Sequence, residues 1–124
     1  MTELESKLKA IIPKPNSQFK KLQGGDPCYF SSWSTDRQGT SCLYYWFWDK
    51  GKTSKNKKRI PIKEIIAAAR ECSETGVFDR DTFRRHCPLA ASDGECAFTM
   101  VGRCLELLGI AEYADHGKGF RKIC

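Results

Sequence analysis

Basic and aromatic side chains are concentrated in one stretch of this chain, and both kinds could bind a polyanion. Residues 50–59 hold six cations and no carboxylate, so this decapeptide accounts for the whole formal net charge of +6. Its cations are Lys50, Lys52, Lys55, Lys57, Lys58 and Arg59. Residues 42–48, just upstream, include two tyrosines, two tryptophans and a phenylalanine. Rings that stack on bases, beside ammonium groups that hold phosphates, are the chemistry of single-stranded nucleic-acid binding.

The aromatic stretch also has a purely structural interpretation. On a strand, Tyr44 and Trp46 would alternate with Leu43 and Tyr45, so both faces are apolar and something must cover the second one. We favour a central strand buried between the N-terminal helix and the later helices, because large aromatic residues are more often found in cores. For the basic segment, a polyanion site and a solvated hairpin tip stay open as alternatives.

Seven cysteines and two histidines are the side chains that could hold a metal or act as nucleophiles. The adjacent His86 and Cys87 could donate to a metal together with Cys72 or Cys96. No CxxC or HxxxH spacing occurs, however, and a buried free cysteine is an ordinary small hydrophobe. We therefore expect packing roles, without disulfides, metal, other cofactor or enzymatic activity, and an exposed thiol at Cys124.

The elements that position these groups fit into one domain. A chain of 124 residues can bury one ordinary core. Its first helical segment, residues 4–12, is too short and too charged to be a signal peptide or a membrane span. We therefore expect a cytoplasmic protein that does not enter a membrane.

The first half of the chain predicts one helix followed by an antiparallel meander. Thr2 and Glu5 have capping-box spacing, and the apolar stripe that follows ends at Pro13. Residues 17–22 have the pattern of one short turn before the glycines at 24 and 25. Strands are predicted at residues 28–33, 42–48 and 59–62, with the basic segment as the loop between the last two.

The second half predicts three helices and a β-hairpin. Apolar periodicity places the helices at residues 62–75, 79–87 and 94–108, with a very short strand at 77–78 and a connecting loop at 88–93. Asp79 is the predicted N-cap of the second helix, and Ser92 with Glu95 forms a predicted capping box for the third. Glu64 is expected on the outer face of the first helix. Gly109 ends the third helix, and residues 110–123 form a hairpin with its turn at Asp115–Gly119.

This order of helix, short strand, two helices and hairpin, over about residues 60–123, resembles the winged helix-turn-helix superfamily. The resemblance implies that the third helix enters the major groove of DNA and that the hairpin is the wing. It implies a groove-facing side made of Glu95, Thr99, Gly102, Arg103 and Glu106, with Arg103 and Thr99 touching bases or phosphate. Phosphate contacts are implied for His116, Lys118, Arg121 and Lys122 of the wing, helped by Arg80, Arg84 and Arg85.

These patterns predict an α+β fold in which residues 1–59 and a winged-helix-like region, residues 60–124, form one folding unit. The first hypothesis is a small nucleic-acid-binding protein, with DNA favoured over RNA. The alternative is a protein-docking or self-assembly module. Glu95 and Glu106 make the outer face of the third helix acidic, and the chain has more apolar faces than a single core can cover. The first hypothesis requires residues 50–59, residues 80–85 and the wing to lie on one side of the molecule. If these segments lie at opposite ends of the molecule, the docking module is the favoured hypothesis.

Overall fold

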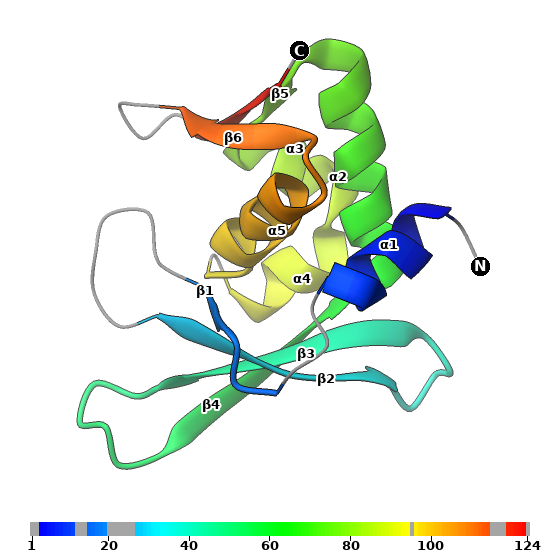
Figure 1. The fold of residues 1–124 in the computed structure, drawn as a ribbon. Coiled ribbons are helices and arrows are strands. Elements are labelled where there is room, and N and C mark those ends of the chain that lie inside the picture. The colour runs from blue at the N-terminus through cyan, green and yellow to red at the C-terminus, as the bar shows by residue number, and fades with distance from the viewer. Residues whose placement is uncertain (1–2, 12–14, 20–26, 95, 115–118, 124) are drawn as a thin grey trace.

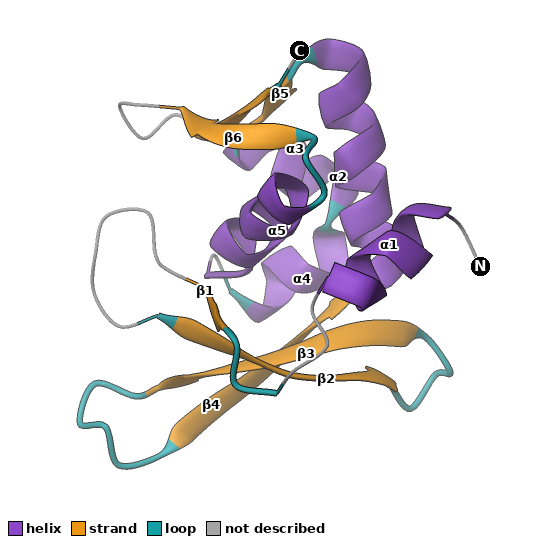
Figure 2. Cartoon of the chain, in the orientation of Figure 1, coloured by secondary structure: helices purple, strands orange, loops and turns teal. Residues whose placement is uncertain are grey.

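The computed structural model describes residues 3–11, 15–19, 27–94, 96–114 and 119–123, and its fold is α+β as predicted. An antiparallel sheet in the order β1-β2-β3-β4 forms one end of the molecule, the helices stand on one of its faces, and a smaller sheet, β5-β7-β6, lies at the other end (Figures 1 and 2). The helices are α1 (Glu3–Ile11), α2 (Ile62–Thr75), α3 (Arg80–His86), α4 (Pro88–Asp93) and α5 (Cys96–Leu107). The strands are β1 (Gln18–Phe19), β2 (Cys28–Thr35), β3 (Ser41–Trp48), β4 (Lys55–Pro61), β5 (Val77–Phe78), β6 (Ala111–Ala114) and β7 (Gly119–Lys122).

The larger sheet confirms the two aromatic strands, β2 and β3, whose residue types favour a pleated, half-buried surface. The short turn predicted at residues 17–22 is wrong for its first half, because Gln18 and Phe19 pair with Tyr29 and Cys28 as the edge strand β1. A two-residue strand carries no periodicity of its own. Its extended form comes from backbone pairing with a neighbour that lies far along the chain.

The helices cover only one face of this sheet, so the predicted burial of both faces of the aromatic strand is wrong. Leu43 and Tyr45 are fully buried under the helices, whereas Tyr44, Trp46 and Trp48 point to the opposite face and are half-buried. Figure 1 shows the reason: α1, α2, α4 and α5 all lie on the same side of β1–β4. The second face of the aromatic strand is therefore part of the molecular surface.

The basic segment is largely a strand and not the predicted loop. β4 begins at Lys55, four residues before the predicted start, and pairs with β3 along its whole length. Only residues 49–54 form the turn. An edge strand rich in lysine is a usual way to keep a free sheet edge from pairing with other chains. The boundary predicted between residues 59 and 60 lies inside β4, which leads directly into α2.

In the second half, the predicted order of helices and strands is observed, with one addition. Residues 88–93, predicted as a loop, form the short helix α4, and Ser92 lies inside it with its hydroxyl donating to the carbonyl of Leu89. The capping box predicted from Ser92 is therefore wrong. Pro88 at the first position of α4 favours the helix start, and the buried carboxylate of Glu64 accepts the amides of Leu89 and Ala90 there.

One core joins the sheet to the helices. Phe78, Phe83, Phe98 and Phe120 pack around one another with ring centroids 5.2–6.4 Å apart, and Tyr45 extends the core to the sheet. Such edge and offset contacts add to the free energy gained from burial. Within the described ranges, no helix has the length and apolar character needed to cross a bilayer.

Candidate nucleic-acid interface

The surface left open by the helices combines rings and cations because of strand register. Side chains that face each other across an antiparallel pair share one face of the sheet. Trp46 faces Lys57 and Trp48 faces Lys55 across β3 and β4, while Trp46 faces Tyr29 across β3 and β2. We call this surface the aromatic face; it consists of Tyr29, Tyr44, Trp46, Trp48, Lys55 and Lys57.

Three rings of the aromatic face, those of Tyr29, Trp46 and Trp48, form one cluster. Tyr29 stacks on Trp46 with centroids 4.3 Å apart and planes inclined by 18°, and Trp48 meets Trp46 edge-on at 5.1 Å. Both arrangements are the ones that the charge distribution of aromatic rings prefers. The cluster is therefore ordered before any ligand arrives, which lowers the entropic cost of binding a flat molecule.

The two lysines of the aromatic face lie over these rings. The Lys55 ammonium is 4.3 Å from the centroid of Trp46 and 5.8 Å from that of Trp48, and the Lys57 ammonium is 5.7 Å from that of Tyr44. Both residues are exposed. Within the described part of the chain, neither ammonium forms an ion pair with a carboxylate. Their charges are therefore available to an incoming anion.

The other predicted cations of this segment are placed differently. Lys58 faces Tyr45 in the register and so lies on the helix-covered side of the sheet. Arg59 faces Tyr44, but its guanidinium lies 3.4 Å from the carboxylate of Asp36. Lys50 and Lys52 are exposed in the turn that joins β3 to β4. The segment therefore presents two cations among the rings and two more at the turn.

Two carboxylates near the aromatic face are committed to local structure. Asp36 accepts the amides of Gln38 and Thr40, and the Thr40 amide is the main reason why its pKa lies below the ordinary value. Asp49 accepts the Ser54 and Thr53 hydroxyls, at 2.7 and 3.0 Å, and the Ser54 bond is the main cause that lowers its pKa to about 2. Both stay ionised near neutral pH, and both shape the loops beside the face.

A pocket of about 200 Å³ opens at the edge of the aromatic face, lined by Pro15, Asn16, Ser31, Trp46, Lys55 and Lys57. Asn16 is held by a backbone bond of 2.6 Å from its amide to the carbonyl of Phe30. Its side-chain oxygen accepts the indole N–H of Trp46 at 3.2 Å. The pocket is thus built from a loop, a strand bulge and the edge strand, which are brought together only by folding.

The remaining predicted cations lie elsewhere and already have partners. Arg80 lies 4.6 Å from the ring centroid of Phe98, and Arg84 pairs with Asp81 at 3.6 Å. Arg85 pairs with Glu71 at 3.3 Å. In β7, Arg121 pairs with Glu112 at 3.1 Å, and Lys122 donates to the carbonyl of Ser73 at 2.9 Å. His116 and Lys118 lie outside the described residues.

The helix expected to read DNA, α5, does not present the predicted groove-facing side. Gly102 is buried, because the ring of Phe120 from β7 lies against it. Arg103 is bound at 2.7 Å by Glu106, whose other oxygen accepts the amide of Tyr113 in β6. Thr99 is half-buried, and Glu95 lies outside the described residues. The prediction of an open face on this helix is therefore wrong for Gly102, because β7 packs against it. Glu106 is partly exposed, but it is engaged by Arg103 and by β6.

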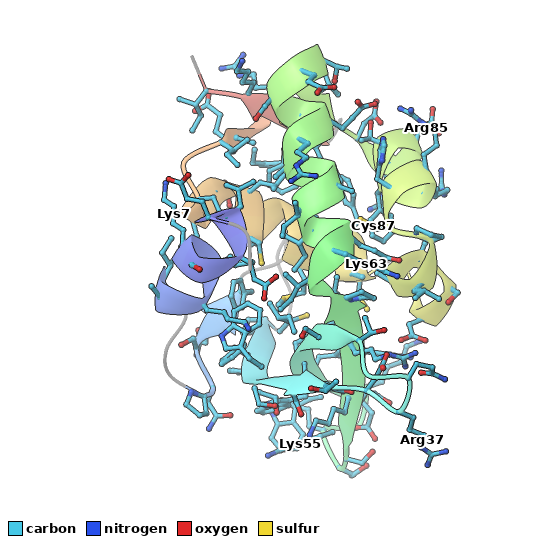
Figure 3. All side chains as sticks on the ribbon, turned by 90° about the vertical axis from the view of Figure 1, so that its right-hand side faces the viewer. Lys7, Arg37, Lys55, Lys63, Arg85 and Cys87 are labelled. Atoms are coloured by element: carbon cyan, nitrogen blue, oxygen red, sulfur yellow. The ribbon has the colours of Figure 1, made fainter. Side chains whose placement is uncertain are left out.

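The three predicted basic clusters do not share one side of the molecule. In Figure 1 the β3–β4 hairpin and the β6–β7 hairpin lie at opposite ends, and Figure 3 shows Lys55 at the sheet end and Arg85 toward the other end. The prediction of one continuous basic surface is therefore wrong. Figure 3 also places Arg37, which lay outside the sequence-based site, at the same end as Lys55.

Of the six cysteines that the structure describes, five are buried and Cys96 is half-buried. Cys87 is buried and its thiol donates to the backbone carbonyl of Glu64 at 3.5 Å, and burial raises the pKa of this thiol to about 12. His86 lies 3.4 Å from Glu71. Among the residues that the structure describes, no three His, Cys, Asp or Glu side chains come together in a group that could hold a metal ion. Cys124 lies outside those residues.

Several residues of the candidate interface were not singled out from the sequence. Tyr29 could have been found, since it alternates with the core-facing Phe30 in a predicted strand, but its pairing with Trp46 depends on register. No pattern in the sequence indicated that Asn16 or Ser31 would belong to the interface. Ser31 is the extra residue of a bulge between Phe30 and Ser32, and bulges re-aim side chains in a way that no local pattern reveals.

The fold and the site define an α+β protein with a surface of ordered rings and lysines on one sheet. Comparisons with protein-family models, with curated proteins and with solved structures found no match for this chain.

Proposed function

We propose that this protein binds single-stranded nucleic acid on the aromatic face. The observation that carries the proposal is the register of β2, β3 and β4, which puts Tyr29, Trp46 and Trp48 on the same face as Lys55 and Lys57. Bases stack on exposed rings, and lysines beside them hold the phosphates. In a duplex the bases are stacked on each other and cannot reach the rings, so the proposal favours single strands.

The lysine that now covers Trp46 does not block this role. A cation–π contact at an exposed site is worth about 0.5–1 kcal/mol, whereas a base stacked on an aromatic side chain contributes about 1–3 kcal/mol. When a base displaces the Lys55 ammonium from the ring, the ammonium becomes available to a phosphate. Both the stacked base and the released ammonium therefore stabilise the bound state.

The C-terminal half enters the proposal as a support for the sheet. Its element order and the strand order β5-β7-β6 support the resemblance to the winged helix-turn-helix superfamily that the sequence suggests. The occupied face of α5 gives no support to DNA reading by this helix. The preference for DNA over RNA stays a prediction, because rings stack on the bases of either.

A salt titration of oligonucleotide binding tests the proposal with a matched control. For single strands, each neutralised phosphate contributes about 0.7 to the slope of log affinity against log salt. The double variant Lys55→Gln/Lys57→Gln should weaken binding and lower the slope by about 1.4. The control, Lys58→Gln, removes one positive charge from the same strand, but this charge lies on the other side of the sheet. The control should therefore change the slope little. Fluorescence anisotropy with labelled single strands and duplexes measures both.

Two outcomes would contradict the proposal. One is an unchanged affinity for single strands when Lys55 and Lys57 are both replaced. The other is a loss from Lys58→Gln equal to that from Lys57→Gln alone, since that would mean that the total charge matters and the aromatic face does not. Trp46→Leu, which keeps bulk at the face but removes the ring, should weaken single-strand binding by about five- to 100-fold if bases stack there.

Protein docking is the second candidate, and two observations favour it. The basic clusters lie at opposite ends of the molecule, which argues against one polyanion surface shared by all three and is the arrangement expected of a docking module. A cavity of about 460 Å³ beside α5 is lined by Ile11, Phe19 and Leu107, together with the ion pair of Arg103 and Glu106. Leu107 is 45% exposed, so its apolar side chain adds to the surface that a partner could cover. Sedimentation at two salt concentrations distinguishes the candidates: a salt-resistant dimer without oligonucleotide binding would support docking or self-assembly.

A further inference from the structure

The pocket at the edge of the aromatic face suggests which bases the protein prefers. We infer that it receives one nucleotide of the bound strand and favours a keto base, such as guanine, thymine or uracil, over an amino base, such as adenine or cytosine. This inference rests on the proposed function and adds base preference to it. It follows from the hydrogen-bonding groups that Asn16, Lys55 and Lys57 present to the pocket.

The orientation of the Asn16 amide follows from its bond to Trp46. An indole nitrogen can only donate a hydrogen bond, so the group that faces it at 3.2 Å must be the amide oxygen. The amide NH₂, with its two donors, is then the group that Asn16 offers to a ligand. The pocket therefore presents donors from Asn16 and from both lysines.

The backbone holds Asn16 in this place before a ligand binds. The Asn16 amide donates to the Phe30 carbonyl, and the Phe30 amide donates to the carbonyl of Ser17 at 2.8 Å. Asn16 has φ of 69°, a left-handed conformation that asparagine tolerates better than most residues. Non-glycine residues in this region are concentrated at functional sites. Here the conformation brings the side chain against Trp46.

A pocket of donors discriminates between bases by what they carry on the major-groove edge. Guanine presents O6 and N7, and thymine presents O4, all of which accept hydrogen bonds. Adenine shares the N7 acceptor with guanine, but at the position of O6 or O4 adenine and cytosine carry an amino group, and this group donates. A donor that faces a donor loses its bond to water and gains none in return. The Ser31 hydroxyl can donate or accept, so it contributes no preference.

Paired oligonucleotides that exchange an amino base for the corresponding keto base test the inference. The probes are single strands of deoxycytidine against deoxyuridine, and of deoxyadenosine against deoxyinosine. Each pair replaces an amino group by a keto oxygen on the same ring system, and the neighbouring ring nitrogen changes from acceptor to donor. We expect the wild-type protein to bind the keto member about three- to tenfold more tightly, the effect of one well-made hydrogen bond. Affinity is measured at constant salt, so that the phosphate contribution cancels in each ratio.

Three variants test whether the preference comes from the pocket. Asn16→Gly removes the amide while keeping a residue that adopts φ of 69° without strain, and should bring both ratios close to one. Lys58→Gln, which changes the same strand on the helix-covered side of the sheet, should leave both ratios as they are. Asn16→Asp, which keeps the bond to Trp46 but replaces the NH₂ by an acceptor, should abolish the keto preference and weaken all binding.

The result separates failure of the inference from failure of the proposed function. Ratios near one in the wild-type protein, with binding that still depends on Lys55 and Lys57, would overturn the base preference and leave the aromatic face as the binding surface. A keto preference that survives Asn16→Gly would also overturn it. Absence of binding to every probe would overturn both.

Discussion

At the scale of single residues, the structure depends on positions where two elements pack so closely that only glycine fits. Gly102 in α5 is the clearest case: a Cβ at this position would lie 2.0–2.6 Å from three ring atoms of Phe120. Sequence periodicity placed Gly102 on an outward face, because glycine has no side chain that reveals what lies next to it. Its role is to let β7 pack directly on α5.

We predict that Gly102→Ala destabilises the protein despite the better helix propensity of alanine. Alanine gains up to about 1 kcal/mol within a helix, but forcing a methyl group into a filled core costs about 1–3 kcal/mol and more when a ring must move. Chemical denaturation should show a net loss. Gly51→Ala is the control, since its Cβ would meet atoms only at 3.7–3.9 Å, and Gly102→Ala/Phe120→Leu should recover part of the stability. A neutral Gly102→Ala would show that Phe120 moves freely.

Asp49 gives a residue-scale prediction for pH. Its pKa of about 2 in the folded protein lies below the ordinary value of 3.8, mainly because the Ser54 hydroxyl binds the ionised carboxylate. A depressed pKa contributes stability that is complete above the ordinary value and is lost as the pH falls toward 2. NMR titration of the Asp49 carboxyl should give a midpoint near 2, and Ser54→Ala should move it upward. A midpoint near 3.8 in the wild-type protein would contradict the hydrogen bonding described for this turn.

At the scale of elements, the connection between α3 and α5 depends on a side chain from another helix. Glu64, in the first turn of α2, is 4% exposed, and its two carboxylate oxygens accept the amides of Ala90 and Leu89 at 3.0 Å. These amides belong to the first turn of α4, which would otherwise leave them without partners. The short helix α4 forms because α2 supplies its cap. This explains why the local sequence of α4 alone predicted a loop.

We predict that Glu64→Ala lowers the free energy of unfolding by about 1.5–3 kcal/mol, the range for hydrogen bonds to a charged group. Glu64→Gln, which keeps one acceptor oxygen, should lose less. Glu74→Ala, on the exposed side of the same helix, is the control and should change stability by less than about 0.5 kcal/mol. Equal effects at positions 64 and 74, measured by urea denaturation, would refute a capping role for Glu64.

At the scale of the whole molecule, separation of the basic clusters decides how binding depends on charge. The aromatic face lies at one end, and the arginines of α3 lie toward the other (Figure 3). At physiological ionic strength, exposed charges are screened beyond about 8 Å. Charges on α3 therefore contribute little to a ligand bound on the larger sheet.

We predict that Arg84→Gln/Arg85→Gln leaves single-strand affinity and its salt slope almost unchanged, although it removes the same two charges as Lys55→Gln/Lys57→Gln. The two arginines pair with Asp81 and Glu71, and such surface pairs contribute little to stability. Anisotropy titrations of both double variants, side by side, provide the measurement. If both lose affinity equally, the nucleic acid contacts both ends and the separation seen here does not limit binding.

The sequence by itself determined which segments become helices and strands wherever periodicity was strong. Residues 62–75, 28–33 and 42–48 were predicted correctly as a helix and two strands. The cap at Asp79 and the left-handed Gly109 that follows α5 were also predicted correctly. These features depend on side chains a few residues apart, whose interactions are the same in any fold. The order of elements in the second half follows from the same local signals.

Only the tertiary structure decided which faces of the sheet are covered and which cations lie beside the aromatic rings. The aromatic strand is apolar on both sides, and nothing local says that all the helices pack on one of them. Register put Lys55 and Lys57 among the rings and turned Lys58 away, and Glu64 made a helix of a predicted loop. Distances between residues far apart in the chain depend on how whole elements pack, and packing is a property of surfaces that form only when the chain has folded.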